Sequence, residues 1–183
     1  MSESDRNPGP LTDRWVLLLA QGFGSGLLKP APGTWGSLVG ILWLLILLSA
    51  SNPVAWAFGT VALLAVAIPV CGRAEVLLGR HDPGSVVLDE IAAVPLIWLG
   101  PLFTPGGQLF ASPVAPSAVA FAYWPELLTG FLAFRFFDVV KPGPIRRIQH
   151  LRGGAGVVAD DVLAALAAAL ITGVVSFLRW RTA

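Results

Sequence analysis

Long apolar stretches alternate with short polar or Pro/Gly-rich stretches over most of the chain. The apolar stretches predict helices at about residues 36–50, 54–71, 88–103, 126–140 and 157–178. No Asp, Glu, Lys or Arg occurs between Lys29 and Arg73, or between Glu90 and Glu126. A helix needs about 20 apolar residues to cross the hydrocarbon core of a bilayer. The pattern therefore predicts an all-α fold: a multi-pass membrane helical bundle with about five transmembrane helices.

The N-terminal region does not resemble a spanning helix. Residues 1–14 predict a polar tail, and residues 15–183 predict a single membrane-embedded domain. Residues 15–37 begin apolar and then break into Gly and Pro, which is typical of an interfacial or re-entrant segment. Their apolar run, Trp15 to Ala20, is shorter than the apolar core of a secretory signal peptide, about 7 to 15 residues. We therefore expect the first long apolar segment to direct membrane insertion.

Composition supports a membrane protein and excludes several other classes. Hydrophobic residues make up 55% of the chain and charged residues 13%, and the mean hydropathy is +0.74. The net charge is +1 and no dense Lys/Arg run occurs, so we expect no nucleic-acid partner. Cys71 is the only cysteine, which excludes an internal disulfide and favours a small buried residue.

Basic residues in the connections predict the orientation. Two connections carry Lys or Arg, namely Arg73, Arg80, Lys141, Arg146, Arg147 and Arg152, whereas the other two are uncharged. The positive-inside rule then places the basic connections and the N-terminus in the cytoplasm. With five spans the C-terminus lies outside, so Arg179 and Arg181 conflict with the rule.

Carboxylates gather at the predicted cytoplasmic ends of three helices. Asp89 and Glu90 open the third helix, Asp160 and Asp161 open the fifth, and Asp138 lies in the last turn of the fourth. The helix dipole favours an acid in a first turn by about 0.3 to 1 kcal/mol, but it disfavours one at a C-terminus. Adjacent carboxylates also repel each other, and a divalent cation relieves the repulsion. The pattern therefore favours a Mg²⁺ site.

Cationic side chains near these acids indicate a phosphate ligand. Arg135 lies three residues before Asp138, on the same helix face, and Lys141 follows. Together they could bind phosphate beside a metal, although a structural ion pair is the alternative for Arg135. Asp82 lies seven residues before Asp89 and shares its face if that helix begins near Asp82.

The stretch PGTWGS, residues 32–37, is expected to form a loop before the first long helix. Backbone N–H groups at a helix N-terminus can bind an anion, and a plain turn with an N-cap is the alternative. No P-loop, HExxH helix or Gly-x-Ser-x-Gly elbow occurs, and His81 and His150 are the only histidines.

Four stretches together resemble the phosphatidylglycerophosphatase A family. They are GFGSGLLKPAPGTWGS (22–37), HDPGSVVLDE (81–90), FRFFDVVKPGPIR (134–146) and GGAGVVADDVLA (153–164). The resemblance implies a Mg²⁺-dependent, multi-pass enzyme of the bacterial inner membrane that hydrolyses phosphatidylglycerophosphate to phosphatidylglycerol at the cytoplasmic face. The implied catalytic residues are Asp82, Asp89, Glu90, Asp138, Asp160 and Asp161, and all of these except Asp82 are also implied metal ligands. The implied phosphate contacts are Arg135, Lys141, Thr34 and Ser37.

A small membrane cation transporter is the alternative from another class, because intramembrane carboxylates often mark ion pathways. A transporter would distribute its acids through the depth of the membrane, whereas the sequence places them at one face. Composition and spacing do not distinguish one lipid phosphomonoester from another, and they point to no oligomeric state.

Overall fold

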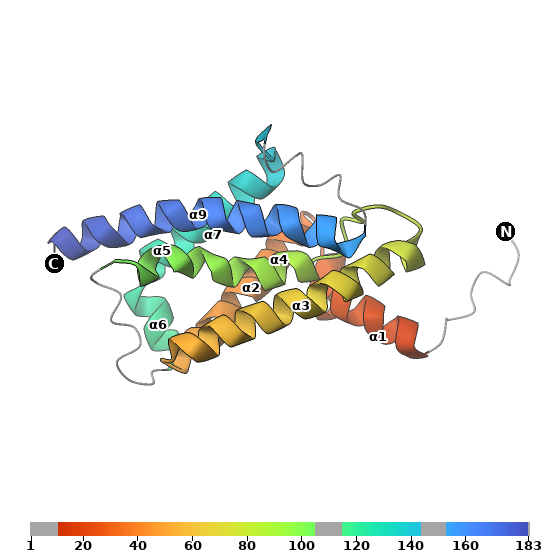
Figure 1. Ribbon diagram of the computed structural model, residues 1–183, viewed down its shortest axis with the longest axis horizontal. Coiled ribbons are helices and arrows are strands. Elements are labelled where there is room, and N and C mark those ends of the chain that lie inside the picture. The colour runs from red at the N-terminus through yellow and green to blue at the C-terminus, as the bar shows by residue number, and fades with distance from the viewer. Residues whose placement is uncertain (1–10, 105–114, 144–152, 183) are drawn as a thin grey trace, which may run out of the picture.

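The computed structural model describes residues 11–104, 115–143 and 153–182, and every regular element within these ranges is a helix (Figure 1). The all-α prediction is confirmed for this part of the chain. In order, the elements are α1 (Leu11–Ala20), η2 (Gly22–Leu27), α2 (Pro32–Ser49), α3 (Pro53–Leu78), α4 (Leu88–Ala93), η3 (Val94–Trp98), α5 (Leu99–Leu102), α6 (Pro116–Ala122), α7 (Trp124–Val140) and α9 (Gly154–Thr182).

Three long helices are apolar enough to cross a membrane: α2, α3 and α9, with 18, 26 and 29 residues. Local sequence explains where α3 begins and ends. The side chain of Asn52 caps its N-terminus by accepting hydrogen bonds from the amides of Val54 and Ala55, at 2.9 and 3.2 Å. Gly79 ends it in the left-handed conformation, which glycine adopts without steric cost.

A fourth crossing exists if α6 and α7 form one bent span. The two helices meet at an angle of 83°. The bend lies where Tyr123 leaves helical geometry, just before Pro125, whose nitrogen has no hydrogen to donate. The seven residues of α6 are too few to cross a membrane alone.

The predicted helix at 88–103 is confirmed as a helical segment, Leu88 to Leu102, but it is not a regular α-helix throughout. The α-helices α4 and α5 are joined directly by the 3₁₀ helix η3, and the three run beside α9 (Figure 1). Pro95 and Pro101 lack N–H groups, and Gly100 weakens helix formation, so a regular α-helix is interrupted. By length and composition alone, three or four helices in the described residues could span a membrane, so the predicted five crossings are not confirmed.

The segment from α4 to α5 is apolar, and other helices of the protein surround it. Val94 and Ile97 are fully buried, and Trp98 is almost so. The segment packs against α2, α3, α7 and α9. A short apolar run looks the same in a sequence whether it faces lipid or a protein interior.

Small residues let α9 approach its neighbours closely. A Cβ atom on Gly100 of α5 would collide with the carbonyl oxygen of Ala169, and one on Gly154 would collide with the main chain of α3 at Ile68. Ala164, Ala165 and Ala168 are fully buried on α9. Such close contacts are typical of helix packing in membranes.

Cys71 on α3 is fully buried, as the sequence predicts.

Several helix ends meet at one end of the bundle. The N-terminal ends of α2, α4 and α9 and the C-terminal ends of α3 and α7 lie toward the end where α1 is found (Figure 1). The short α1 and η2 cover this end, with the chain turning at Gly22, Phe23 and Gly24 in the left-handed region. The C-terminus of α9 lies at the opposite end.

Candidate active site

The meeting helix ends enclose a polar cavity of about 370 Å³. All the acids proposed from the sequence line it, together with both proposed cations: Asp82, Asp89, Glu90, Asp138, Asp160, Asp161, Arg135 and Lys141. These side chains come from α4, α7, α9 and the connection after α3, segments that are far apart in the sequence. The fold thus brings the predicted carboxylates into one site.

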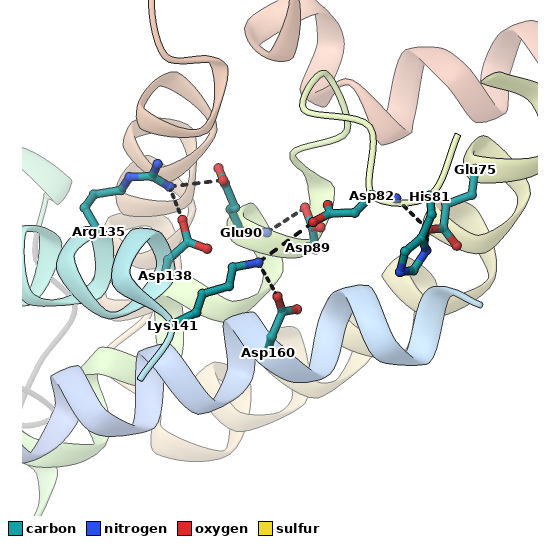
Figure 2. A network of polar contacts seen from close by, with 9 residues as sticks. All are labelled: Glu75, His81, Asp82, Asp89, Glu90, Arg135, Asp138, Lys141 and Asp160. Atoms are coloured by element: carbon teal, nitrogen blue, oxygen red, sulfur yellow. Dashed lines mark hydrogen bonds and ion pairs between the residues drawn. The ribbon is translucent and has the colours of Figure 1, made fainter. Parts of the chain in front are cut away.

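Arg135 bridges two carboxylates from different helices (Figure 2). Its Nη1 lies 3.0 Å from Glu90 Oε1 and 2.7 Å from Asp138 Oδ2. The neighbouring helix α2 leaves room for this pair by having no side chain there. A Cβ atom on Gly33 would collide with Glu90 and the guanidinium of Arg135, and one on Gly36 would collide with Glu90. The small residues of the PGTWGS stretch therefore shape the site.

Lys141 holds the other side of the cavity (Figure 2). It ends α7 in the left-handed conformation, with φ of 45°, and this turns its side chain toward α9. Its Nζ lies 2.5 Å from Asp160 Oδ2 and 3.8 Å from Asp82 Oδ2. Partial burial lowers the pKa of Lys141, but the hydrogen bond and charge of Asp160 outweigh it, so the pKa is raised. Lys141 therefore stays charged at neutral pH.

Negative charge exceeds positive charge in this cavity, where the carboxylates above face only Arg135 and Lys141. Asp89 and Asp161 are each only 4% exposed, and Asp89 Oδ1 accepts a hydrogen bond from the amide of Glu90 at 3.0 Å. Within the described residues, Glu90 Oε2 and Asp160 Oδ1 are buried with no hydrogen-bond partner. Buried acceptors without partners are rare and costly, so these two oxygens are suited to bind a ligand in the cavity.

The residues present fit Mg²⁺ in their chemistry. Mg²⁺ is a hard cation that takes carboxylate oxygens as ligands, with water and substrate phosphate completing its coordination. The two unpartnered oxygens could coordinate such an ion, and its positive charge would offset the excess of negative charge in the cavity. In the part of the chain that the structure describes, no three acidic, His or Cys side chains already converge on one point.

Asp82 reaches the cavity from a loop and not from a helix. The expectation that it shares a helix face with Asp89 is wrong, because α4 begins only at Leu88. Asp82 has φ of 47° and precedes Pro83. Its side chain is 37% exposed, the most exposed carboxylate in the ion pairs of the cavity, and it lies near the mouth.

The PGTWGS stretch forms the first turns of α2 and not a loop. Pro32 starts the helix, and Ala31, Pro32 and Gly33 line the cavity. Thr34 and Ser37, the predicted phosphate contacts, are not in the lining. Ser37 is fully buried, and its Oγ accepts a hydrogen bond from Arg135 Nη1 at 3.4 Å.

Two features were missed by the sequence interpretation. Glu75 accepts hydrogen bonds from the amide of Asp82 at 2.8 Å and pairs with His81 Nδ1 at 2.6 Å (Figure 2). At the far end of the bundle, Glu126 is buried and lies 2.5 Å from Arg179 Nη1. The sequence does not show that a carboxylate at the end of one helix pairs with a cation at the end of another.

The predicted cytoplasmic residues Arg146, Arg147 and Arg152 lie outside the described residues.

The fold and the cavity define a class: helical membrane proteins with a site at one end of the bundle that is rich in carboxylates and also contains an arginine and a lysine. Comparison with known proteins supplies the family. Residues 18–176 match the model for phosphatidylglycerophosphatase A, so the chain belongs to that family, and it is a phosphatase of phospholipid metabolism.

Similar proteins cover nearly the whole chain. A phosphatidylglycerophosphatase A of Haemophilus influenzae is 36% identical over 88% of this chain and 89% of its own length. One of Escherichia coli K12 is 34% identical over 83% of this chain and 78% of its own length. A Bacteroides thetaiotaomicron protein named "Putative phosphatidylinositol-3-phosphatase" is 33% identical over 90% of this chain and 93% of its own length. No solved structure matches the chain.

Proposed function

We propose that this protein hydrolyses the phosphomonoester of phosphatidylglycerophosphate, giving phosphatidylglycerol and inorganic phosphate. The observation that carries the proposal is the meeting of Arg135 and Lys141 with the carboxylates in one cavity, in a chain of this family. Two relatives that cover most of the chain are named for this substrate. The lipid's acyl chains would stay in the bilayer while the headgroup enters the cavity.

Mg²⁺ is the cofactor that we propose, and Asp89, Glu90, Asp138, Asp160 and Asp161 are the residues that would hold it. Both buried oxygens without partners belong to this set. When bound, the ion would polarise a phosphoryl oxygen and offset its charge.

Arg135 and Lys141 would bind the substrate phosphate. Both now contact carboxylate oxygens, and a phosphate oxygen can replace a carboxylate oxygen in the same charge-assisted hydrogen bonds. Arg135 would place its guanidinium on one side of the phosphorus and Lys141 its ammonium on the other. Both charges would then stabilise the negative charge on the transferring group.

Asp82 is our candidate for the general base. It lies at the mouth, where water enters, whereas Asp89 and Asp161 are buried and better placed to hold a metal. Asp82 would take a proton from a water molecule as that water attacks phosphorus. The phosphorus–oxygen bond to glycerol then breaks, and the leaving oxygen takes up a proton. This route predicts that no phosphate-labelled protein is trapped during turnover of labelled substrate.

We also propose that the cavity faces the cytoplasm at the bacterial inner membrane, with the N-terminus on the same side. Arg73, Arg80 and Lys141 belong to the cavity end. Arg179 lies at the far end, but Glu126 offsets its charge, which relieves the conflict with the positive-inside rule. The buried segment from α4 to α5 would be the fifth crossing, enclosed by the other helices.

The exposed apolar side chains of α1 and η2, Leu11, Trp15 and Phe23, support an interfacial position for these elements. No observation favours the cation transporter. The relatives described above are named as phosphatases, and the spanning helices α2, α3 and α9 carry no acid near their middle.

A substrate panel tests the proposal. The purified protein in detergent would be given phosphatidylglycerophosphate, phosphatidylinositol 3-phosphate and phosphatidate, each with Mg²⁺, and released phosphate would be measured. The proposal predicts the highest kcat/KM for phosphatidylglycerophosphate. A higher value for either other lipid would contradict the assigned headgroup while keeping the protein a lipid phosphatase.

A further inference from the structure

Glu75 lies beside the cavity but does not line it. It is in the last turn of α3, and its side chain is only 10% exposed. The proposed reaction gives it no role. A carboxylate that is largely withdrawn from solvent, next to a candidate site, requires an explanation.

Both the main chain and the side chain of Glu75 hold the segment that follows α3. Its carbonyl oxygen accepts a hydrogen bond from the amide of Arg80 at 3.2 Å, beside the left-handed Gly79. Its Oε1 accepts a second hydrogen bond from the amide of Asp82, at 2.8 Å, and lies 2.6 Å from His81 Nδ1. One residue therefore fixes three consecutive residues of this turn.

The backbone of Asp82 needs such support. Its φ is 47°, in the left-handed region that residues with a side chain rarely adopt. Pro83 follows, and a residue before proline normally takes an extended conformation. This combination persists only where neighbouring contacts enforce it. The hydrogen bond from the Asp82 amide to Glu75 is a direct contact of that kind (Figure 2).

We propose that Glu75 is a positioning residue, which acts through the main chain of Asp82 and holds the Asp82 carboxylate at the mouth of the cavity, facing Lys141. The inference rests on the proposed role of Asp82. A plain ion pair between Glu75 and His81 is the competing explanation. His81 is 58% exposed, and exposed pairs of this kind contribute little.

Hydrogen exchange tests the positioning without any substrate. In Glu75→Ala the amide of Asp82 loses its acceptor, so we expect its exchange to be about tenfold faster or more. Arg73→Ala is the matched control, because Arg73 lies on the same helix and pairs with Asp13 at 2.9 Å, away from the turn. Equal exchange at Asp82 in the wild type and Glu75→Ala would overturn the proposal.

Glu75→Gln separates the two explanations and guards against misfolding of the alanine variant. Glutamine keeps an oxygen that can accept from the Asp82 amide, but it removes the charge that pairs with His81. We expect Gln to keep the slow exchange at Asp82. Exchange as fast as in the alanine variant, in protein with an unchanged unfolding midpoint, would assign the effect to the His81 pair and overturn the proposal.

A double-mutant cycle links the contact to turnover. We expect Glu75→Ala to lower kcat about tenfold with little change in KM, and to cause no further loss in an Asp82→Ala background. The same fold loss in both backgrounds would show that Glu75 acts independently of Asp82, contradicting the proposal. If the wild type releases no phosphate, the proposed function fails, and hydrogen exchange still decides the role of Glu75.

Discussion

At the residue scale, the site depends on the geometry of a few side chains. Arg135 contacts two carboxylates through one nitrogen, and Lys141, which ends α7 in a left-handed conformation, contacts Asp160 of α9. Spacing in the sequence predicts that Arg135 meets Asp138. It gives no sign that Arg135 also meets Glu90, which is 45 residues away in the chain.

Arg135→Lys should reduce kcat/KM by about 10²-fold, because an ammonium group does not reproduce the planar set of N–H donors that a guanidinium can offer to a phosphate. Steady-state phosphate release is the measurement. Arg179→Lys at the far end of the bundle is the control and should keep the wild-type value. Equal values for Arg135→Lys and the wild type would show that Arg135 is only a structural ion pair.

Gly33→Ala should also lower activity, since its Cβ atom would collide with Glu90 and the guanidinium of Arg135. We expect an effect of about tenfold or more on kcat/KM, with a normal unfolding midpoint. In Gly143→Ala the added methyl group meets open space, so this variant controls for the loss of a glycine. Full activity of Gly33→Ala would contradict the close fit of α2 against the ion pair.

At the element scale, the sequence predicts some helices better than others. The apolar runs that became α2, α3 and α9 are long, and the proline and asparagine residues that begin α2 and α3 are visible in the sequence. The run 88–103 is helical as predicted, but its burial inside the protein was not predictable, because burial inside protein and exposure to lipid select similar residues. Pro95, Gly100 and Pro101 were the signal that this segment is not a regular α-helix throughout. Glu75 was overlooked because its partner, the main-chain amide of Asp82, leaves no mark in a sequence.

Gly100→Ala should destabilise the packing of α5 on α9. The added Cβ atom would collide with the main chain near Ala169 and Gly173, and overpacking of this kind costs about 1 to 3 kcal/mol. Thermal unfolding in detergent is the measurement, with Gly143→Ala as the control. An unchanged unfolding midpoint would show that α5 and α9 are less closely packed than described.

At the scale of the whole molecule, the two ends of the bundle differ. One end holds the carboxylate cavity, and the other holds the single pair between Glu126 and Arg179, which joins α7 to α9. Family membership explains why the acids were recognisable from the sequence, since three of the four motifs carry them. The pair at the far end lies outside those motifs, and only the folded chain brings its members together.

Arg179→Ala should lower stability without changing catalysis. It leaves Glu126, which is 2% exposed, without its cation, and an unpaired buried charge costs about 3 kcal/mol. We expect a lower unfolding midpoint and an unchanged KM. Partial recovery of stability in the double variant Glu126→Gln, Arg179→Ala would confirm the cause, whereas an unchanged midpoint in Arg179→Ala would contradict it.

The central claim is that the cavity is a Mg²⁺-dependent phosphatase site, and the most direct measurement is phosphate release from phosphatidylglycerophosphate with Mg²⁺ and with EDTA. It would be made on the wild type, on Asp160→Asn and on the control Asp13→Asn, whose residue pairs with Arg73 outside the cavity. The account predicts turnover that requires both Mg²⁺ and Asp160 and that survives in Asp13→Asn. Full turnover in EDTA, or in folded Asp160→Asn, would contradict it.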